Sequence, residues 1–160
     1  MLSKLTQYNL WANQITTGYV LKAGETIADI EQPGSFPTVR KTLLHIWDAQ
    51  FIWLSRLQGT SLTDFPSKSF KGNLAEACDG LLKSSQQFID YVESLNGNYD
   101  TVFAYHTLDG KKFENKVADI IIHAINHGTY HRGQIINLLR GAGFTEVGST
   151  DYMRFCRNPV

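Results

Sequence analysis

The stretch from about Asn115 to Arg140 constrains the fold more than any other part of the chain. Its apolar residues recur every three or four positions, which is the spacing of one face of an α-helix. On an ideal helix they fall within roughly 40° of one line. The members of this stripe are Val117, Ile121, Ala124, Gly128, Ile135 and Leu139. A long helix with one apolar stripe must pack that stripe against other elements, and the rest of the chain indicates which ones.

Three further segments have helical patterns and boundary signals. They are residues 2–22, a stretch that begins between Ser35 and Thr38 and ends near Leu57, and Leu74–Leu95. Gly24 ends the first helix or lies just beyond it, and Asn73 followed by Glu76 resembles an N-cap with its acidic partner. A loop is expected over residues 59–72, which contain Pro66 and Gly72.

Residues 99–114 have a different character. They are rich in strand formers, and Asp109-Gly110 is a favoured two-residue hairpin turn. We therefore expect a small hairpin-like insertion before the fourth helix, and a short last helix over Asp151–Cys156. Four long helices with two long connections predict an all-α fold, a four-helix bundle with long crossover connections.

Length and charge narrow the class of protein. A chain of 160 residues is most simply one domain, 1–160, and its fifteen basic residues balance fifteen acidic ones. Without a basic run, nucleic acid and anionic membrane surfaces are not expected partners. No secretion signal or membrane span is evident, and Cys78 and Cys156 lack a metal or disulfide spacing. We expect a cytoplasmic protein with reduced thiols.

The helix over 115–140 carries the sequence HAINHGTYHRGQI, in which three of the five histidines stand four residues apart. Measured from the centre of the apolar stripe, His131 lies about 40° away and is predicted to face the core. His127 lies about 80° away, at the edge of the core. Gln134 and His123, at about 100° and 120°, lie closer to solvent or to a cavity mouth. The three histidines are therefore not equivalent.

Two histidines at i and i+4 lie on one helix face, so both rings can reach a single ion. A buried imidazole is costly unless its ring nitrogens find partners, and a metal supplies one. The alternative is that His131 bonds a carbonyl across the core and His127 is a partly wet surface ring. Spacing alone does not choose between the two interpretations.

The motif of an H-x3-H followed by R-G-Q and an apolar run, here His127, His131 and RGQ at 132–134, resembles the last long helix of the DinB (damage-inducible) superfamily. Three other segments are similar to parts of that family: YNLWANQ, TLLHIWDAQFIWLSRLQG and TDYMRF. The resemblance thus spans nearly the whole chain. It implies a four-helix bundle and a metal-dependent enzyme, related to the bacillithiol- and mycothiol-dependent S-transferase-like proteins.

The resemblance also implies a metal held by His45, His127 and His131. From periodicity alone His45 is a core or boundary histidine, because its helix is apolar nearly all the way round. Three imidazoles with an open position are typical of catalytic zinc, although nickel, iron or manganese would also fit. Such a metal activates a bound water, as in a hydrolase-like enzyme. The resemblance to S-transferase-like proteins implies instead that it activates a low-molecular-weight thiol for S-transfer.

Other polar residues receive weaker assignments. Asp48 is either an acceptor for the second ring nitrogen of His45 or an ordinary exposed acid. Gln134 and His123 are candidates for lining the mouth of the site, while Arg132 and Arg140 are interpreted as helix-surface or helix-dipole charges. No catalytic base is identifiable. The competing hypotheses are a non-catalytic metal-binding bundle and a metal-free dimerising or small-ligand bundle, and a homodimer is compatible with the apolar surplus on the second helix.

Overall fold

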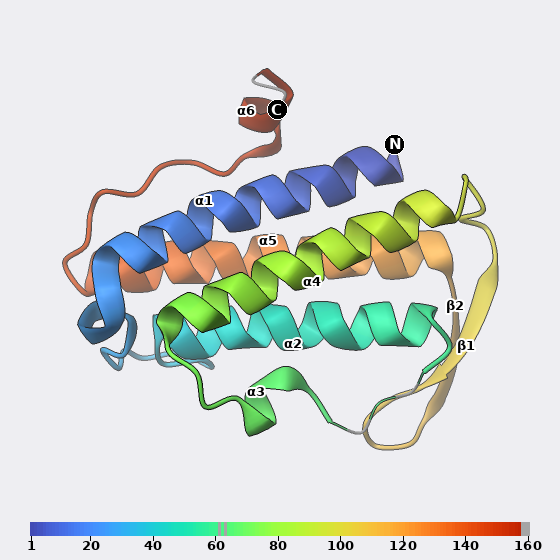
Figure 1. The fold of residues 1–160 in the computed structure, drawn as a ribbon, viewed down its shortest axis with the longest axis horizontal. Helices are drawn as coiled ribbons and strands as arrows, with labels where there is room; N and C mark the ends of the chain where they lie inside the picture. The colour runs from blue at the N-terminus through green and yellow to red at the C-terminus, as the bar shows by residue number, and fades with distance from the viewer. Residues whose placement is uncertain (61, 63, 158–160) are drawn as a thin grey trace.

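Four long helices run along one another in the computed structural model, which describes residues 1–60, 62 and 64–157 (Figure 1). They are α1 (Leu2–Ala28), α2 (Val39–Leu57), α4 (Leu74–Ser94) and α5 (Val117–Gly141). Helices α1 and α2 each pack against both α4 and α5, so α1 and α2 lie on one diagonal and α4 and α5 on the other. The predicted all-α four-helix bundle is confirmed.

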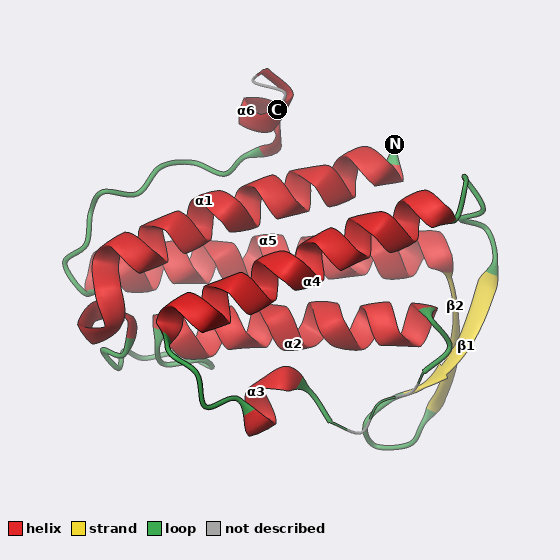
Figure 2. Cartoon of the chain, in the orientation of Figure 1, coloured by secondary structure: helices red, strands yellow, loops and turns green. Residues whose placement is uncertain are grey.

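The connections between the helices differ in length and path (Figure 2). The segment 58–73 contains the short helix α3 (Pro66–Ser69) and crosses the length of the bundle between α2 and α4. Strands β1 (Val102–His106) and β2 (Lys112–Lys116) form an antiparallel hairpin at one end, between α4 and α5. After α5 the chain returns along α1 to α6 (Tyr152–Arg157), which packs against α1.

Most predicted helix ends are correct to within about two residues, but the first helix continues six residues past the predicted end at residue 22. At Gly24 the backbone leaves the helical region, with φ of 83°, yet one further turn of helix follows as far as Ala28. Helix α5 begins at Val117 rather than Asn115, because Asn115 and Lys116 pair with β1. The predicted capping box is confirmed: the Asn73 side chain accepts from the Glu76 N–H, and the Glu76 carboxylate accepts from the Asn73 N–H.

The hairpin is present where the sequence predicts it, but its turn is wider than the two residues expected. The Thr107 N–H donates to the Lys111 carbonyl at 2.9 Å, and the Gly110 N–H donates to the Thr107 carbonyl at 2.9 Å. Gly110 has a φ of 81°. A tight turn followed by a glycine in the left-handed region is the usual three-residue hairpin loop, so the glycine signal was right and the turn length wrong.

Part of the predicted loop over 59–72 is helical, and residues 61 and 63 lie outside the described part of the chain. Pro66 opens α3, where its missing N–H costs nothing. The Asp48 carboxylate then accepts hydrogen bonds from the backbone N–H and the hydroxyl of Ser67. These two hydrogen bonds hold the segment between α2 and α4 against α2.

The core has two apolar clusters with a polar layer between them. The layer contains side chains from all four long helices: Asn9, Asn13, Gln50, Ser84, Ser85 and Arg132. The Arg132 guanidinium donates to the amide oxygens of Asn9 at 2.8 Å and of Asn13 at 2.9 Å. The Asn9 amide donates to Gln50 at 2.8 Å, and the Gln50 amide donates to the hydroxyls of Ser84 and Ser85.

The interpretation of Arg132 as a surface charge is wrong. Its side chain is 1% exposed, its guanidinium lies 5.7 Å from the centre of the Tyr8 ring, and no carboxylate among the described residues pairs with it. Burial lowers its pKa. The stripe geometry puts Arg132 on the far side of the core from His127, where α1 closes the bundle. A Cβ at Gly128 would lie 3.0 Å from Arg132 and from Asn9, which explains a glycine in mid-helix.

Within the described ranges, none of the helices is both long enough and apolar enough to cross a membrane.

Candidate metal centre

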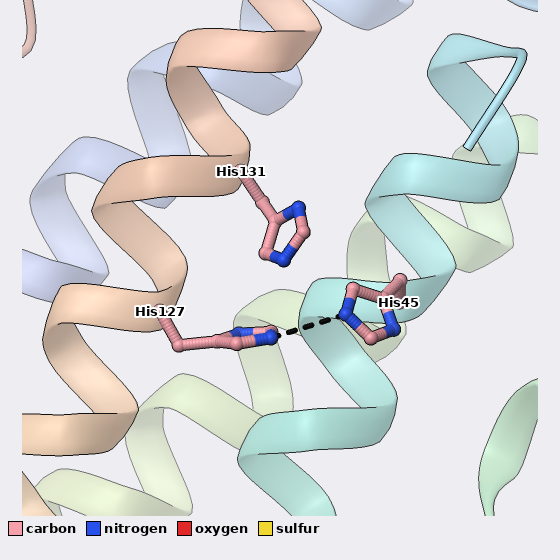
Figure 3. Close-up of side chains that lie close together, drawn as sticks. All are labelled: His45, His127 and His131. Carbon is pink, nitrogen blue, oxygen red and sulfur yellow. Dashed lines mark hydrogen bonds between the residues drawn. The ribbon is translucent and has the colours of Figure 1, made fainter. Parts of the chain in front are cut away.

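The three histidines named by the resemblance lie together between α2 and α5 (Figure 3). His127 and His131 project from successive turns of α5, and His45 faces them from α2. The predicted apolar stripe of α5 is buried throughout, which turns His131 inward to 6% exposure and leaves His127 half-buried. The face predicted for each histidine is therefore correct, including His123, which is exposed.

The separations of the ring nitrogens suit a shared ion. Nε2 of His127 lies 3.1 Å from Nε2 of His45, and one nitrogen from each of the three rings lies within 4.8 Å of the others. Two imidazoles on a tetrahedral ion with Zn–N bonds of about 2.0–2.1 Å stand roughly 3.3 Å apart. The His45–His127 pair already has this spacing, and His131 needs only a small approach. An ion here would lie in a set of three neutral nitrogen donors.

Gln134 orients the buried His131 ring. The Nδ1 of His131 lies 2.7 Å from the Gln134 amide oxygen. Because an amide oxygen only accepts, this bond keeps the proton on Nδ1 and leaves the lone pair of Nε2 available for a metal. Gln134, which was expected to flank the mouth of the site, contacts the histidine cluster directly.

Burial keeps these imidazoles neutral. It lowers the pKa of His45 to about 4, and the neighbouring His131 ring adds to the effect. Burial also lowers the pKa of His127 to about 4, with contributions from His131, His45 and His123. The pKa of His131 is lowered by burial and raised in part by its bond to Gln134. Neutral imidazole is the form that binds metals, so protons compete weakly for the site at neutral pH.

The surroundings of His45 differ from one expectation. Asp48 does not contact His45, because it points toward α3 and bonds Ser67. Instead, the Phe36 ring stacks on the His45 ring with the ring centres 4.0 Å apart, and its edge meets His131 at 5.5 Å. The loop before α2 thus covers one side of the cluster. No sequence signal marked Phe36, since an aromatic residue between Ser35 and Pro37 has no helical spacing.

His123 lies one turn along α5 from the cluster, with its ring centre 6.2 Å from that of His127. It is not among the grouped ligand nitrogens. Its ring meets the edge of Trp53 at 4.9 Å, on α2. His123 is therefore an exposed neighbour of the cluster, on the side that the helical geometry predicts.

The fold and the histidine cluster define a helical bundle with a candidate three-histidine metal centre. The DinB family model matches residues 1–158, and the chain belongs to the DinB family. Protein DinB of Bacillus subtilis is 27% identical over 156 residues, which cover 93% of this chain and 90% of that protein. The crystal structure of a DinB-like protein from Bacillus cereus superposes with a TM-score of 0.69 at 20% identity, covering 91% of this chain and 95% of the other.

Proposed function

We propose that this DinB family protein is a divalent-metal-dependent enzyme that activates a low-molecular-weight thiol or a water. The observation that carries the proposal is the convergence of His45, His127 and His131 on one point, with neutral rings and no fourth protein ligand grouped with them among the described residues. When bound there, a zinc, nickel, iron or manganese ion lowers the pKa of a thiol or water at its open position. The reaction class is thiol S-transfer or hydrolysis.

The chain's own residues prepare such a reaction. Gln134 holds the tautomer of His131, and Phe36 excludes water from one side of the rings. His123, one turn along α5 from the cluster, contacts Trp53 on α2, and we propose that these two rings flank the path by which a small molecule arrives. Three imidazole donors, which leave a coordination position of a tetrahedral ion open, suit catalysis better than a closed structural site with four protein ligands.

Elemental analysis of untreated protein tests the proposal first, and we expect about one divalent ion per three-histidine site. Replacement by Co²⁺ then gives a visible spectrum in which thiolate binding produces a new absorption band. Screening small thiols against electrophiles should reveal turnover. Retained metal without exchange or turnover would favour the non-catalytic metal-binding bundle. No retained metal, with melting unchanged by chelator, would favour the metal-free bundle.

The expected setting belongs to the same proposal. We place the protein in the cytoplasm, which agrees with the free thiols of Cys78 and Cys156. The expected partner is a small-molecule substrate, with no nucleic-acid or membrane partner expected, and a homodimer is the proposed assembly. Size measurement in solution tests the dimer, and cell fractionation tests the location.

A further inference from the structure

Strand β2 is an edge strand with an exposed outer side. All five of its residues, Lys112–Lys116, are exposed, and among the described residues it pairs with β1 alone. The hairpin lies at one end of the bundle, between α4 and α5 (Figure 1). An edge strand presents unpaired backbone groups to which another strand can bind. This edge is therefore a candidate interaction surface.

The register of the hairpin decides which backbone groups point outward. The Thr107 N–H donates to the Lys111 carbonyl at 2.9 Å. Because hydrogen-bonded positions alternate along an antiparallel strand, Phe113 also directs its backbone groups toward β1. Lys112 and Glu114 then direct their N–H and C=O groups away from β1. No hydrogen bond from another described residue reaches these outward groups.

The side chains of β2 lie on two different faces of the hairpin. Phe113 is opposite Tyr105, and their rings stack with the ring centres 6.3 Å apart. Tyr105 is buried against Trp53, whereas Phe113 is 47% exposed. Lys112 and Glu114 alternate onto the other face, where their charged groups lie 3.3 Å apart. The strand thus presents an exposed ring on one face and two opposite charges on the other.

A second copy of the same strand complements this edge in one register. Two identical antiparallel strands are related by a two-fold axis. With the axis at Phe113, Lys112 of each copy faces Glu114 of the other, and the outward backbone groups of both residues form hydrogen bonds. The two Phe113 residues then meet at a non-hydrogen-bonded position, with Cα atoms about 4.5 Å apart. Opposite charges and paired aromatic rings both stabilise cross-strand neighbours.

The other registers that align the outward groups are unfavourable. An axis at Lys112 or at Glu114 places that residue directly opposite its own copy, and like charges in this position are destabilising. An axis at Asn115 places Lys112 opposite Ala118, which already belongs to α5 and cannot extend a strand. The charges and the start of the helix therefore both favour the first register.

We propose that two copies of this protein associate through their β2 strands, which form a four-stranded antiparallel sheet with the two-fold axis at Phe113. The proposal rests on the homodimer of the proposed function, to which it assigns an interface. The rings of Tyr105 and Phe113 from both copies form one row on the inner face, and two Lys112–Glu114 ion pairs form on the outer face. A five-residue edge is smaller than a standard interface, so the dimer should dissociate on dilution.

Sedimentation of the whole protein over a concentration series measures the dimer. Glu114→Lys makes both ion pairs repulsive, and Lys112→Glu does the same, so each should raise the dissociation constant roughly 10- to 100-fold. A mixture of the two variants has opposite charges at both positions, so the heterodimer should form with about the parent affinity. Each variant has like charges within its own strand, so only pairing between copies explains that recovery. Lys83→Glu, at an exposed position on α4, is the control and should dimerise like the parent.

A cross-link tests the register independently and keeps both charges, so it decides the case in which a charge variant does not fold. In a Cys156→Ser background, Phe113→Cys brings two thiols within disulfide range, and oxidation should give a covalent dimer. The two copies of Asn115→Cys would lie roughly 13 Å apart and should not link.

The outcomes separate this interface from the proposed function. A dimer that both charge variants leave unchanged, or that links through Asn115→Cys and not through Phe113→Cys, would overturn the interface while leaving the homodimer intact. A monomer at every concentration would overturn the interface and the homodimer together, and would leave the proposed metal chemistry untouched.

Discussion

His131 and Arg132 are neighbours in the sequence, but their side chains point to different sides of α5 and have different hydrogen-bond partners. His131 points toward the His45 and His127 rings between α2 and α5, in a candidate metal centre whose other two members are half-buried. Arg132 faces α1, where amide oxygens accept its hydrogen bonds in a closed layer. The same helix therefore carries polar groups that are satisfied by the protein and polar groups that are kept available. We expect the first kind to determine stability and the second kind to determine metal binding.

The largest effect should follow Arg132→Ala. It leaves the amide oxygens of Asn9 and Asn13 without a donor, and each buried orphan acceptor costs about 1–3 kcal/mol. We expect the free energy of unfolding of the metal-free protein to fall by roughly 2–6 kcal/mol in urea denaturation. Arg140→Ala, on the exposed face of the same helix, should change it by no more than about 0.5 kcal/mol. Similar losses for the two arginines would break the comparison.

His131→Ala should have the reverse profile. Metal occupancy should fall by more than the roughly 10- to 100-fold expected for the loss of an outer partner. The metal-free protein should lose about 1 kcal/mol of stability, an ordinary value for one substitution. His123→Ala is the matched control and should retain its metal. Metal analysis of both variants gives the answer, and equal losses would contradict the facing assigned to the three rings.

Gln134→Leu should weaken metal binding without removing it. The Nδ1 proton of His131 loses its acceptor, so the ring is no longer held in the tautomer that offers Nε2. A loss of about 10- to 100-fold in affinity is expected from competition with a coloured chelator. Gln134→Glu keeps an acceptor and should bind metal at least as well as the parent. Unchanged affinity in Gln134→Leu would show that the hydrogen bond has no orienting role.

The smallest effect is expected for Ser84→Ala, at the edge of the polar layer. The Gln50 amide still donates to Ser85 when Ser84 is shortened. The cost should be about 0.5–1.5 kcal/mol in the same urea experiment, with metal affinity unaffected. A change in metal affinity would mean that the polar layer and the histidine cluster are coupled. The two kinds of polar group would then differ only in degree in their effects on stability and on metal binding.

Sequence reasoning succeeded where one local pattern decides the outcome. Helical spacing predicted the buried stripe of α5 and the ranking of His131, His127 and His123. The Asn73–Glu76 capping box was visible for the same reason. Periodicity could not orient His45, because its helix is apolar on several sides, and the resemblance to a family was needed to pair it with α5.

The failures have the opposite cause, in that they depend on contacts between distant segments. In the sequence Arg132 resembles a surface residue, because Asn9 and Asn13, which accept its hydrogen bonds, belong to the distant helix α1. Asp48 bonds Ser67 of the crossover, and Phe36 stacks on His45 from a loop with no periodicity. Tertiary partners of this kind are absent from single-sequence patterns.

The polar layer also fixes how α2 and α5 are positioned relative to each other along the length of the bundle. Gln50 follows His45 by five residues on α2, and Arg132 directly follows His131 on α5, with Asn9 joining the two. A slip of either helix by one turn, about 5.4 Å, would break these bonds and carry one imidazole out of range of the others. The polar layer thereby holds the register in which the three imidazoles meet, although none of its residues belongs to the histidine cluster.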